Sequence, residues 1–313
     1  MRRILNRCWL LSLAMLCAGV AFGESKTVDV PAQLFEKANL LWIKGFPGDA
    51  LEKFRTVYRK YPASPQAPHA AYHVARLYEL NNEDLPAFNA YQELFDRFKG
   101  ANYFNQVISG QIAAAERLLE KIQAQERNPL TALPKDFPDK KTVLGLFYQV
   151  VKNSGTSEST PKVQYRLAVA LEQLGFLDDA RKEHESLVDE FPQHYLADDA
   201  LFQVAYIDAK RSRKAGQTAT GSMSPRHIAL MSLTYFTVTY PQSEKIPVAQ
   251  QLMKELKRED LEALARTAYF YEKSGKKDAA KIYWKRVLEQ PADFLEAAPA
   301  ITEQARAAFK AEE

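Results

Sequence analysis

Residues 31–62 decide the fold, and they read PAQLFEKANLLWIKGFPGDALEKFRTVYRKYP. Within this stretch Ala50, Phe54, Val57 and Pro62 stand at offsets of 0, 4, 7 and 12 residues. Offsets of 0, 4 and 7 place three side chains on one face of a helix. A small first residue lets a neighbouring helix come close, and proline at offset 12 ends the helix. The stretch therefore predicts a helix that packs closely on a partner and stops at Pro62.

The same spacing recurs along the chain. The further copies, in the same order of offsets, are Ala87, Tyr91, Leu94 and Lys99; Val143, Phe147, Val150 and Gly155; Ala180, His184, Leu187 and Pro192; Ala229, Leu233, Phe236 and Pro241; and Ala280, Trp284, Val287 and Pro291, with the last proline one residue early. A second amphipathic pattern, such as Leu34-Ala38-Leu41, precedes each copy across a short turn. Helices therefore alternate with turns along most of residues 31–292.

This pattern resembles the tetratricopeptide repeat, a helix–turn–helix unit of about 34 residues. The small residue at offset 0, the aromatic at offset 4 and the proline at offset 12 match the second helix of that family. We therefore expect an all-α, tetratricopeptide-type α-solenoid of about five to six helix hairpins. The uneven spacing of the copies predicts insertions at residues 129–138 and 212–224, and one long helix over residues 247–273.

The N-terminus has the pattern of an export signal. Three arginines precede an apolar run, and small residues lead to a cleavage point after Gly23. We expect residues 1–23 to be a signal peptide and the protein to be exported to the periplasm. The alternative is a lipoprotein signal acylated at Cys17, although Leu16 before it is bulkier than such signals use. Residues 24–127 and 128–313 are expected to be N-terminal and C-terminal repeat domains, the latter with inserted loops.

Composition excludes several classes of function. Both cysteines, Cys8 and Cys17, fall within the expected signal peptide, which argues against disulfides, iron–sulfur clusters and a cysteine nucleophile. Without the three arginines of residues 1–23, the chain has 39 basic and 39 acidic side chains. Nucleic-acid binders usually carry a basic excess, so we expect no nucleic-acid partner.

We find no catalytic signature in the sequence. His69 and His73 have the i, i+4 spacing of zinc ligands, but Ala70 stands where a catalytic H-E-x-x-H motif has its glutamate. Residues 216–222 have the glycine spacing of a phosphate-binding loop, without the Lys-Ser/Thr that follows in such loops. His184 replaces an aromatic residue at offset 4 and is interpreted as a packing residue. We therefore expect neither a cofactor nor a metal, and no enzymatic activity.

Basic residues gather in three places along the second half of the chain. They are Lys210, Arg211, Arg213 and Lys214; Lys254, Lys257 and Arg258; and Lys277, Lys281 and Lys285. A solvated helix face is the default interpretation of such clusters. If the clusters converge in space, they would fit peripheral contact with acidic headgroups of a membrane, or an acidic partner.

The remaining candidate is a binding surface for protein or peptide partners. First helices of stacked repeats line a concave side, which receives an extended peptide or a helix. Aromatic and arginine side chains suit such a surface because they bury a large area at low rotamer cost. The candidate partner-binding residues are Phe35, Asn39 and Trp42 in the first repeat and Tyr72, Arg76 and Glu79 in the second. Core packing between helices is the alternative role for the aromatic ones.

Within the repeat proteins, the chain resembles the outer-membrane assembly lipoproteins of the BamD (YfiO) type. The similarity lies in the order of six segments, namely residues 60–65 (KYPASP), 84–87 (DLPA), 240–244 (YPQSE), 264–265 (LA), 269–271 (YFY) and 279–280 (AA). This resemblance implies a scaffold at the inner face of the outer membrane that holds a barrel-assembly protein or nascent barrel proteins. A general cell-envelope adaptor for cell-wall or secretion machinery is the alternative.

Overall fold

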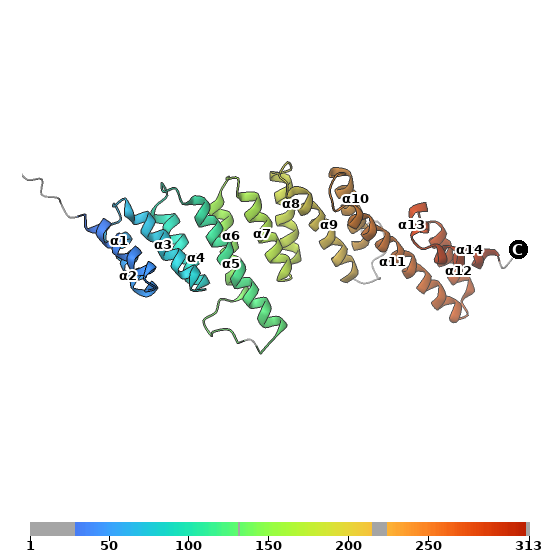
Figure 1. Ribbon diagram of the computed structural model, residues 1–313. Coiled ribbons are helices and arrows are strands. Elements are labelled where there is room, and N and C mark those ends of the chain that lie inside the picture. Colours follow the sequence, from blue (N-terminus) through green and yellow to red (C-terminus); the bar gives the residue numbers. More distant parts are fainter. Residues whose placement is uncertain (1–28, 131, 215–223, 311–313) are drawn as a thin grey trace, which may run out of the picture. The chain divides into compact units, whose positions relative to one another are not determined.

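The computed structural model describes residues 29–130, 132–214 and 224–310, and these residues form fourteen helices and no strand (Figure 1). The helices are α1 (Val30–Ile43), α2 (Pro47–Lys60), α3 (Gln66–Leu80), α4 (Asp84–Arg97), α5 (Phe104–Arg127), α6 (Lys140–Ser154), α7 (Thr160–Gln173), α8 (Leu177–Glu190), α9 (Ala197–Lys214), α10 (Pro225–Thr239), α11 (Ile246–Lys273), α12 (Lys277–Leu288), α13 (Ala292–Ala297) and α14 (Pro299–Lys310). The expected signal peptide with both cysteines, and residues 216–222, lie outside the described residues.

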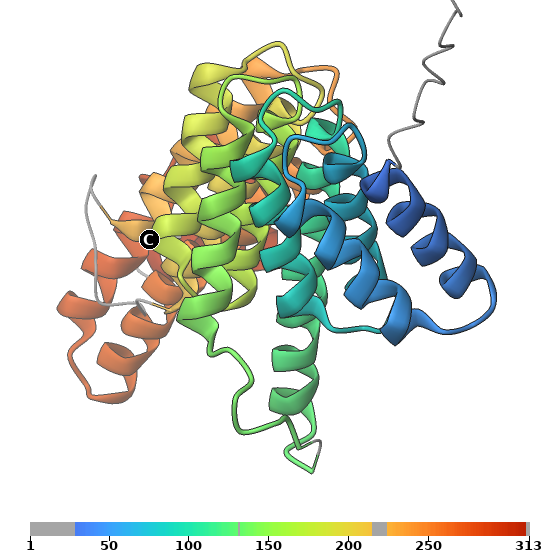
Figure 2. The same cartoon turned by 90° about the vertical axis from the view of Figure 1, so that its left-hand side faces the viewer.

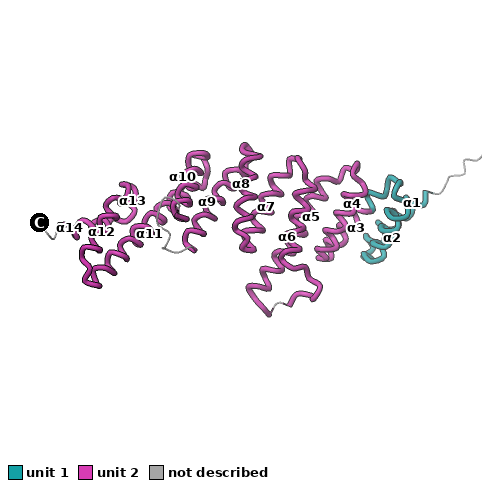
Figure 3. Tube along the Cα trace, turned by 180° about the vertical axis from the view of Figure 1, so that it is seen from behind, with its two compact units in different colours: residues 1–70 teal, residues 71–313 magenta. Residues whose placement is uncertain are grey.

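The chain divides into two compact units, residues 1–70 and residues 71–313 (Figure 3). Among the described residues, unit 1 contains α1, α2 and the first turn of α3, and unit 2 contains the rest. The predicted boundary between residues 127 and 128 lies inside unit 2, where α5 ends, and it stays a prediction.

The residues at offsets 0, 4 and 7 of the predicted copies form the buried face of the second helix in each hairpin. Every residue at offsets 0, 4 and 7 of the six copies is at most 2% exposed. In unit 2 each helix from α4 to α11 packs against the next one along the chain, and the first helices α5 and α7 also touch. The all-α, tetratricopeptide-type fold is thereby confirmed, with six helix pairs from α1–α2 to α11–α12, followed by α13 and α14.

The turns within the hairpins share a backbone conformation. Gly45, Asn82, Gly175 and Gly275 all have φ between +59° and +85°, and each stands five residues before the small residue of its copy. A residue with Cβ rarely adopts this left-handed region, and asparagine tolerates it best among them. The positions of glycine and asparagine therefore fix where the first helix stops and the second begins.

Two elements depart from the regular hairpin, and the sequence predicts one of them. The long helix expected over residues 247–273 is α11, Ile246–Lys273. Helix α5 has 24 residues, and its C-terminal end extends beyond its neighbours to the proline-punctuated connection before α6 (Figure 2). Among the described residues, no helix is both long and apolar enough to cross a membrane.

Candidate functional site

A hollow of about 440 Å³ lies between the first helices α3 and α5 in unit 2. It contains all three predicted partner-binding residues of the second repeat, Tyr72, Arg76 and Glu79. The other lining residues are Tyr91 of α4 and Asn105, Gln106, Ser109, Gly110 and Ala113 of α5. Aromatic, charged and amide groups thus meet around one space, a combination that suits recognition of a peptide backbone and its side chains.

Hydrogen bonds hold the charged side of this hollow in place. Glu79 forms an ion pair with Arg76 one turn earlier, and the buried Tyr91 hydroxyl donates to Glu79 Oε2 at 2.8 Å. Burial, followed by the bond to Glu79, raises the pKa of Tyr91, so this hydroxyl keeps its proton. Burial lowers the pKa of Arg76, but its contacts with Tyr91 and Glu79 outweigh that effect and raise it.

Behind Glu79, a buried carboxylate ties α4 to α5. Asp84 is 3% exposed, and it accepts a hydrogen bond from Arg117 Nε at 2.5 Å and one from Lys121 Nζ at 2.6 Å. Arg117 Nη1 also lies 3.8 Å from Glu79 Oε1. A buried carboxylate needs such partners because removing it from water is costly. The network fixes α5 against the α3–α4 hairpin. It has three cations, Arg76, Arg117 and Lys121, and only the two carboxylates of Glu79 and Asp84.

Close packing of α5 on α4 sets the depth of the hollow. A Cβ on Gly110 would lie 2.3 Å from the Tyr91 ring, so the absence of a side chain allows this approach. On the other side, Tyr72 stacks on Tyr103 with ring centroids 4.7 Å apart and planes at 22°. The aromatic wall of the hollow is therefore built from α3, α4 and the residue before α5.

A second hollow, of about 270 Å³, lies between the first helices α5 and α7. Glu116, Glu120 and Gln123 line it from α5, and Arg166 lines it from α7. Arg166 pairs with Glu116 at 3.4 Å. Residues 106, 109, 113, 116, 120 and 123 follow the three- and four-residue spacing of one helix face. One face of α5 therefore lines both hollows, and we call this face together with its neighbours on α3 and α7 the first-helix groove.

The predicted residues of the first repeat lie in unit 1, and two of them serve packing there. Phe35 and Trp42 meet the fully buried Phe54 of α2 edge to face, with ring centroids 5.5 Å and 6.5 Å apart. Both rings are half-buried, as is Asn39 between them on the same face of α1. The alternative role that the sequence left open for Trp42, packing between helices, is present in the structure.

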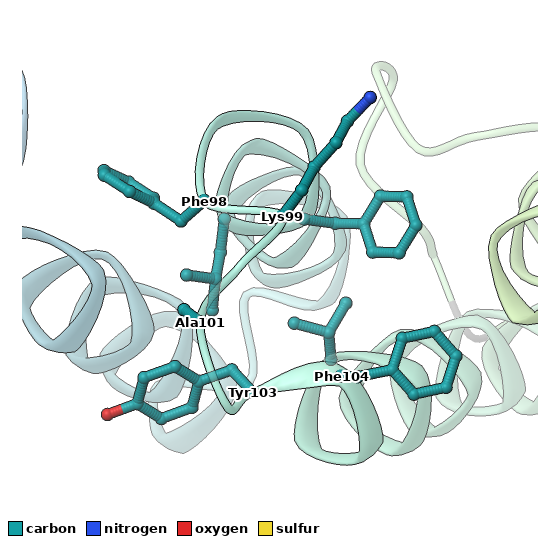
Figure 4. A pocket seen from close by; sticks show the side chains of 8 residues that line it. Phe98, Lys99, Ala101, Tyr103 and Phe104 are labelled. Carbon is teal, nitrogen blue, oxygen red and sulfur yellow. The ribbon is translucent and has the colours of Figure 1, made fainter.

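The connection between α4 and α5 forms an apolar hollow of about 240 Å³ that sequence reasoning missed. Figure 4 shows Phe98 and Tyr103 extending to one side of the connection and Phe104 to the other. Lys99 is its one charged lining residue, at the position where three other copies of the repeat have proline. The density of aromatic residues between positions 95 and 104 is the sequence signal that could have revealed it.

The packing role predicted for His184 is confirmed. Its side chain is fully buried in α8, 5.3 Å from the Tyr165 ring, and neither ring nitrogen has a hydrogen-bond partner. Burial lowers its pKa to about 4. His184 therefore stays neutral at pH values where an exposed histidine is charged.

Most of the clustered basic residues are paired with carboxylates. The pairs in the described residues include Lys210–Glu172 (2.6 Å), Arg211–Asp178, Arg213–Glu255 (3.0 Å), Lys257–Asp293 (2.5 Å), Arg258–Glu262 (3.4 Å) and Lys285–Glu289 (3.8 Å). These pairs reduce the positive charge that the clusters could offer to an acidic membrane surface. Across residues 29–130, 132–214 and 224–310, no three metal-ligating side chains come together to hold an ion.

Among known proteins, the chain is similar to solved structures of tetratricopeptide-repeat proteins. No protein-family model matches the chain, and no curated protein sequence matches it. YrrB, described as a tetratricopeptide protein with an unusual peptide-binding site, is 15% identical, with a TM-score of 0.37 over 70% of this chain and 90% of its own. A repeat protein from Cytophaga hutchinsonii is 15% identical, with a TM-score of 0.41 over 91% of this chain and 90% of its own.

Proposed function

We propose that this protein is a non-enzymatic scaffold that binds an extended segment of a partner protein in the first-helix groove. The observation that carries the proposal is the continuous face of α5, which lines one hollow with α3 and a second with α7. A segment lying along α5 would contact both hollows, which gives it more buried area than either hollow offers alone.

The side chains of the groove define what such a segment meets. Asn105, Gln106 and Ser109 offer donors and acceptors to a peptide backbone, and all three are exposed. Tyr72 adds an aromatic surface that the stack with Tyr103 holds rigid, which lowers the entropy lost on binding. Around α3 the excess of cations favours an acidic side chain in the segment, whereas Glu116 and Glu120 favour a basic one near α7.

We further propose that this scaffold lies in the periplasm and takes part in outer-membrane protein assembly. It is supported by the export signal that the sequence predicts in residues 1–23 and by the segments that resemble, in the same order, those of the BamD type. The partner would then be a barrel-assembly protein or a nascent barrel protein.

The experiment is crosslinking and affinity capture from envelope fractions, with three forms of the full chain. The wild type is compared with Ser109→Trp, which fills the groove, and with Lys152→Trp, which places the same side chain on an exposed position of α6. We expect Ser109→Trp to reduce capture at least about tenfold, a loss of about 1.4 kcal/mol, and Lys152→Trp to leave it unchanged. Equal capture by all three forms would refute binding in the groove.

The identity of the captured protein separately tests the role in outer-membrane protein assembly. Recovery of an outer-membrane barrel with periplasmic domains supports the assembly role. Recovery of cell-wall or secretion components in its place would make the protein a general envelope adaptor. The intact mass of the captured bait shows whether the chain is cleaved after Gly23 or acylated at Cys17.

A further inference from the structure

The outward face of α10 carries four large apolar side chains. Ile228, Met231, Tyr235 and Val238 follow one another at steps of three, four and three residues, so they share one face of the helix. They are 36%, 60%, 58% and 73% exposed. We call these four residues the α10 stripe. A contiguous exposed apolar surface of this kind marks an interaction site more often than a scatter of single residues does.

The other second helices show that the fold does not require apolar residues here. Counted from the small residue of each copy, the stripe occupies offsets −1, +2, +6 and +9. The same offsets hold Asp49, Glu52, Thr56 and Arg59 in α2; Pro86, Asn89, Glu93 and Asp96 in α4; Thr142, Gly145, Gln149 and Lys152 in α6; Asp179, Lys182, Ser186 and Asp189 in α8; and Ala279, Ile282 and Arg286 in α12 with Glu289 directly after it. None of these five helices has a large apolar residue at more than one of the offsets. The stripe is therefore specific to α10.

The stripe borders a hollow of about 540 Å³ that is lined by the second helices α8 and α10 and by α9 between them. Met231 and Tyr235 of the stripe line this hollow, as do Val188 of α8 and Leu201 and Val204 of α9. The apolar surface of α10 thus continues into a concave space that could bury side chains of a partner.

Acidic groups line the α8 side of the same hollow. Glu185 and Asp189 lie there with Arg181, whose charge is already engaged, because Arg181 pairs with Glu185 at 2.7 Å and with the buried Asp208 at 2.9 Å. Asp189 is exposed and has no ion-pair partner among the described residues. Glu185 and Asp189 together outnumber Arg181, so the lining of the hollow carries a net negative charge, which repels anionic lipid headgroups and attracts cationic side chains.

We propose that the α10 stripe and the α8–α10 hollow form a second docking surface, which binds an amphipathic helix of a partner protein with lysine or arginine beside its apolar face. Apolar residues at helical spacing on the partner would cover the stripe, and its cations would face Glu185 and Asp189. This surface is built from second helices and does not depend on the first-helix groove.

The probes are two synthetic, side-chain-stapled helices of about 18 residues with identical apolar faces. One carries lysine on both flanks of that face, and the other carries glutamate. Binding to the full chain is measured by fluorescence anisotropy at low salt. We expect the lysine helix to bind at least about tenfold more tightly than the glutamate helix, and its affinity to fall as salt is added.

Variants place the binding on the proposed surface. Met231→Ser combined with Tyr235→Ser should weaken the lysine helix at least about tenfold, whereas Ile282→Ser, at the equivalent offset +2 of α12, should not. Asp189→Lys should reduce or reverse the difference in affinity between the lysine helix and the glutamate helix. Both positions of the double variant are exposed, so its melting temperature should match the wild type.

Four results would overturn the proposal. They are equal binding of the two helices, binding of the lysine helix that survives the double variant, flotation with anionic vesicles that the double variant abolishes, and a concentration-dependent dimer in light scattering that the double variant abolishes. The third would assign the stripe to a membrane, and the fourth would assign it to a second copy of this chain.

Discussion

A single residue, His184, departs from the aromatic and aliphatic residues that the other copies place at offset 4. Its imidazole is fully buried and lacks a hydrogen-bond partner, so the protein must keep it neutral. Burial lowers the pKa of the His184 imidazole from its ordinary value of 6.5 in the unfolded chain to about 4 in the folded chain. Between these values the unfolded state holds more protons, and stability falls as the pH falls.

We therefore predict that His184→Phe weakens the pH dependence of stability. From pH 7 to pH 4.5 the wild type should lose about 2 kcal/mol more unfolding free energy than the variant. Urea unfolding followed by circular dichroism at both pH values measures the difference. Phenylalanine fits because Phe54 and Phe147 occupy this offset in other copies. Equal losses in the two proteins would show that His184 titrates normally in the fold.

Gly110 is the residue on which the close contact between α4 and α5 depends. Gly110→Ala should destabilise the protein by about 1–3 kcal/mol, because the new Cβ meets the buried Tyr91 ring. The matched control is Gly145→Ala in α6, where an added Cβ has nothing within 4 Å and alanine favours the helix by up to about 1 kcal/mol. Thermal melting should move in opposite directions for the two variants. A shift of Gly110→Ala in the same direction as its control would contradict the contact.

At this scale the sequence predicted burial well and contacts poorly. Offsets of 0, 4 and 7 identify the core residues because helical periodicity alone sets which side chains face inward. The bond between Tyr91 and Glu79, or between Asp84 and Arg117, joins residues 12 and 33 positions apart. Such bonds depend on how neighbouring helices are placed, which periodicity does not specify.

At the scale of the element, the small residue at offset 0 sets the distance between helices. Ala180 is fully buried in a cluster with Leu171 of α7 and Ile207 of α9. We predict that Ala180→Leu destabilises the array by about 1–3 kcal/mol through overpacking. Ala307→Leu, on the exposed side of α14, is the control and should change the melting temperature little. An unchanged melting temperature for Ala180→Leu would mean that the small residue is dispensable.

The ends and lengths of the helices were largely predictable. Proline and left-handed glycine or asparagine are local signals, and the predicted long helix agrees with α11 to within one residue. The aromatic hollow between α4 and α5 was not predictable in the same way. It requires the rings of Phe95 and Phe104, from consecutive helices, to lie with their centroids 6.4 Å apart.

At the scale of the whole molecule, the candidate site was half predicted. Tyr72, Arg76 and Glu79 lie together because they share one face of α3, which follows from their spacing. The α5 residues opposite them were absent from the prediction, because no copy of the repeat pattern was recognised in the sequence of α5. Phe35, Asn39 and Trp42 belong to unit 1, and their role in partner binding stays a prediction.

Site-specific photocrosslinking in envelope preparations shows whether a partner segment runs along α5. A photoreactive amino acid replaces Ser109 in the first hollow, Glu120 in the second, or Lys152 on the exposed face of α6. We predict that positions 109 and 120 crosslink to the same protein and that position 152 does not. Crosslinking from position 152 at comparable yield, or none from positions 109 and 120, would show that no partner segment runs along α5.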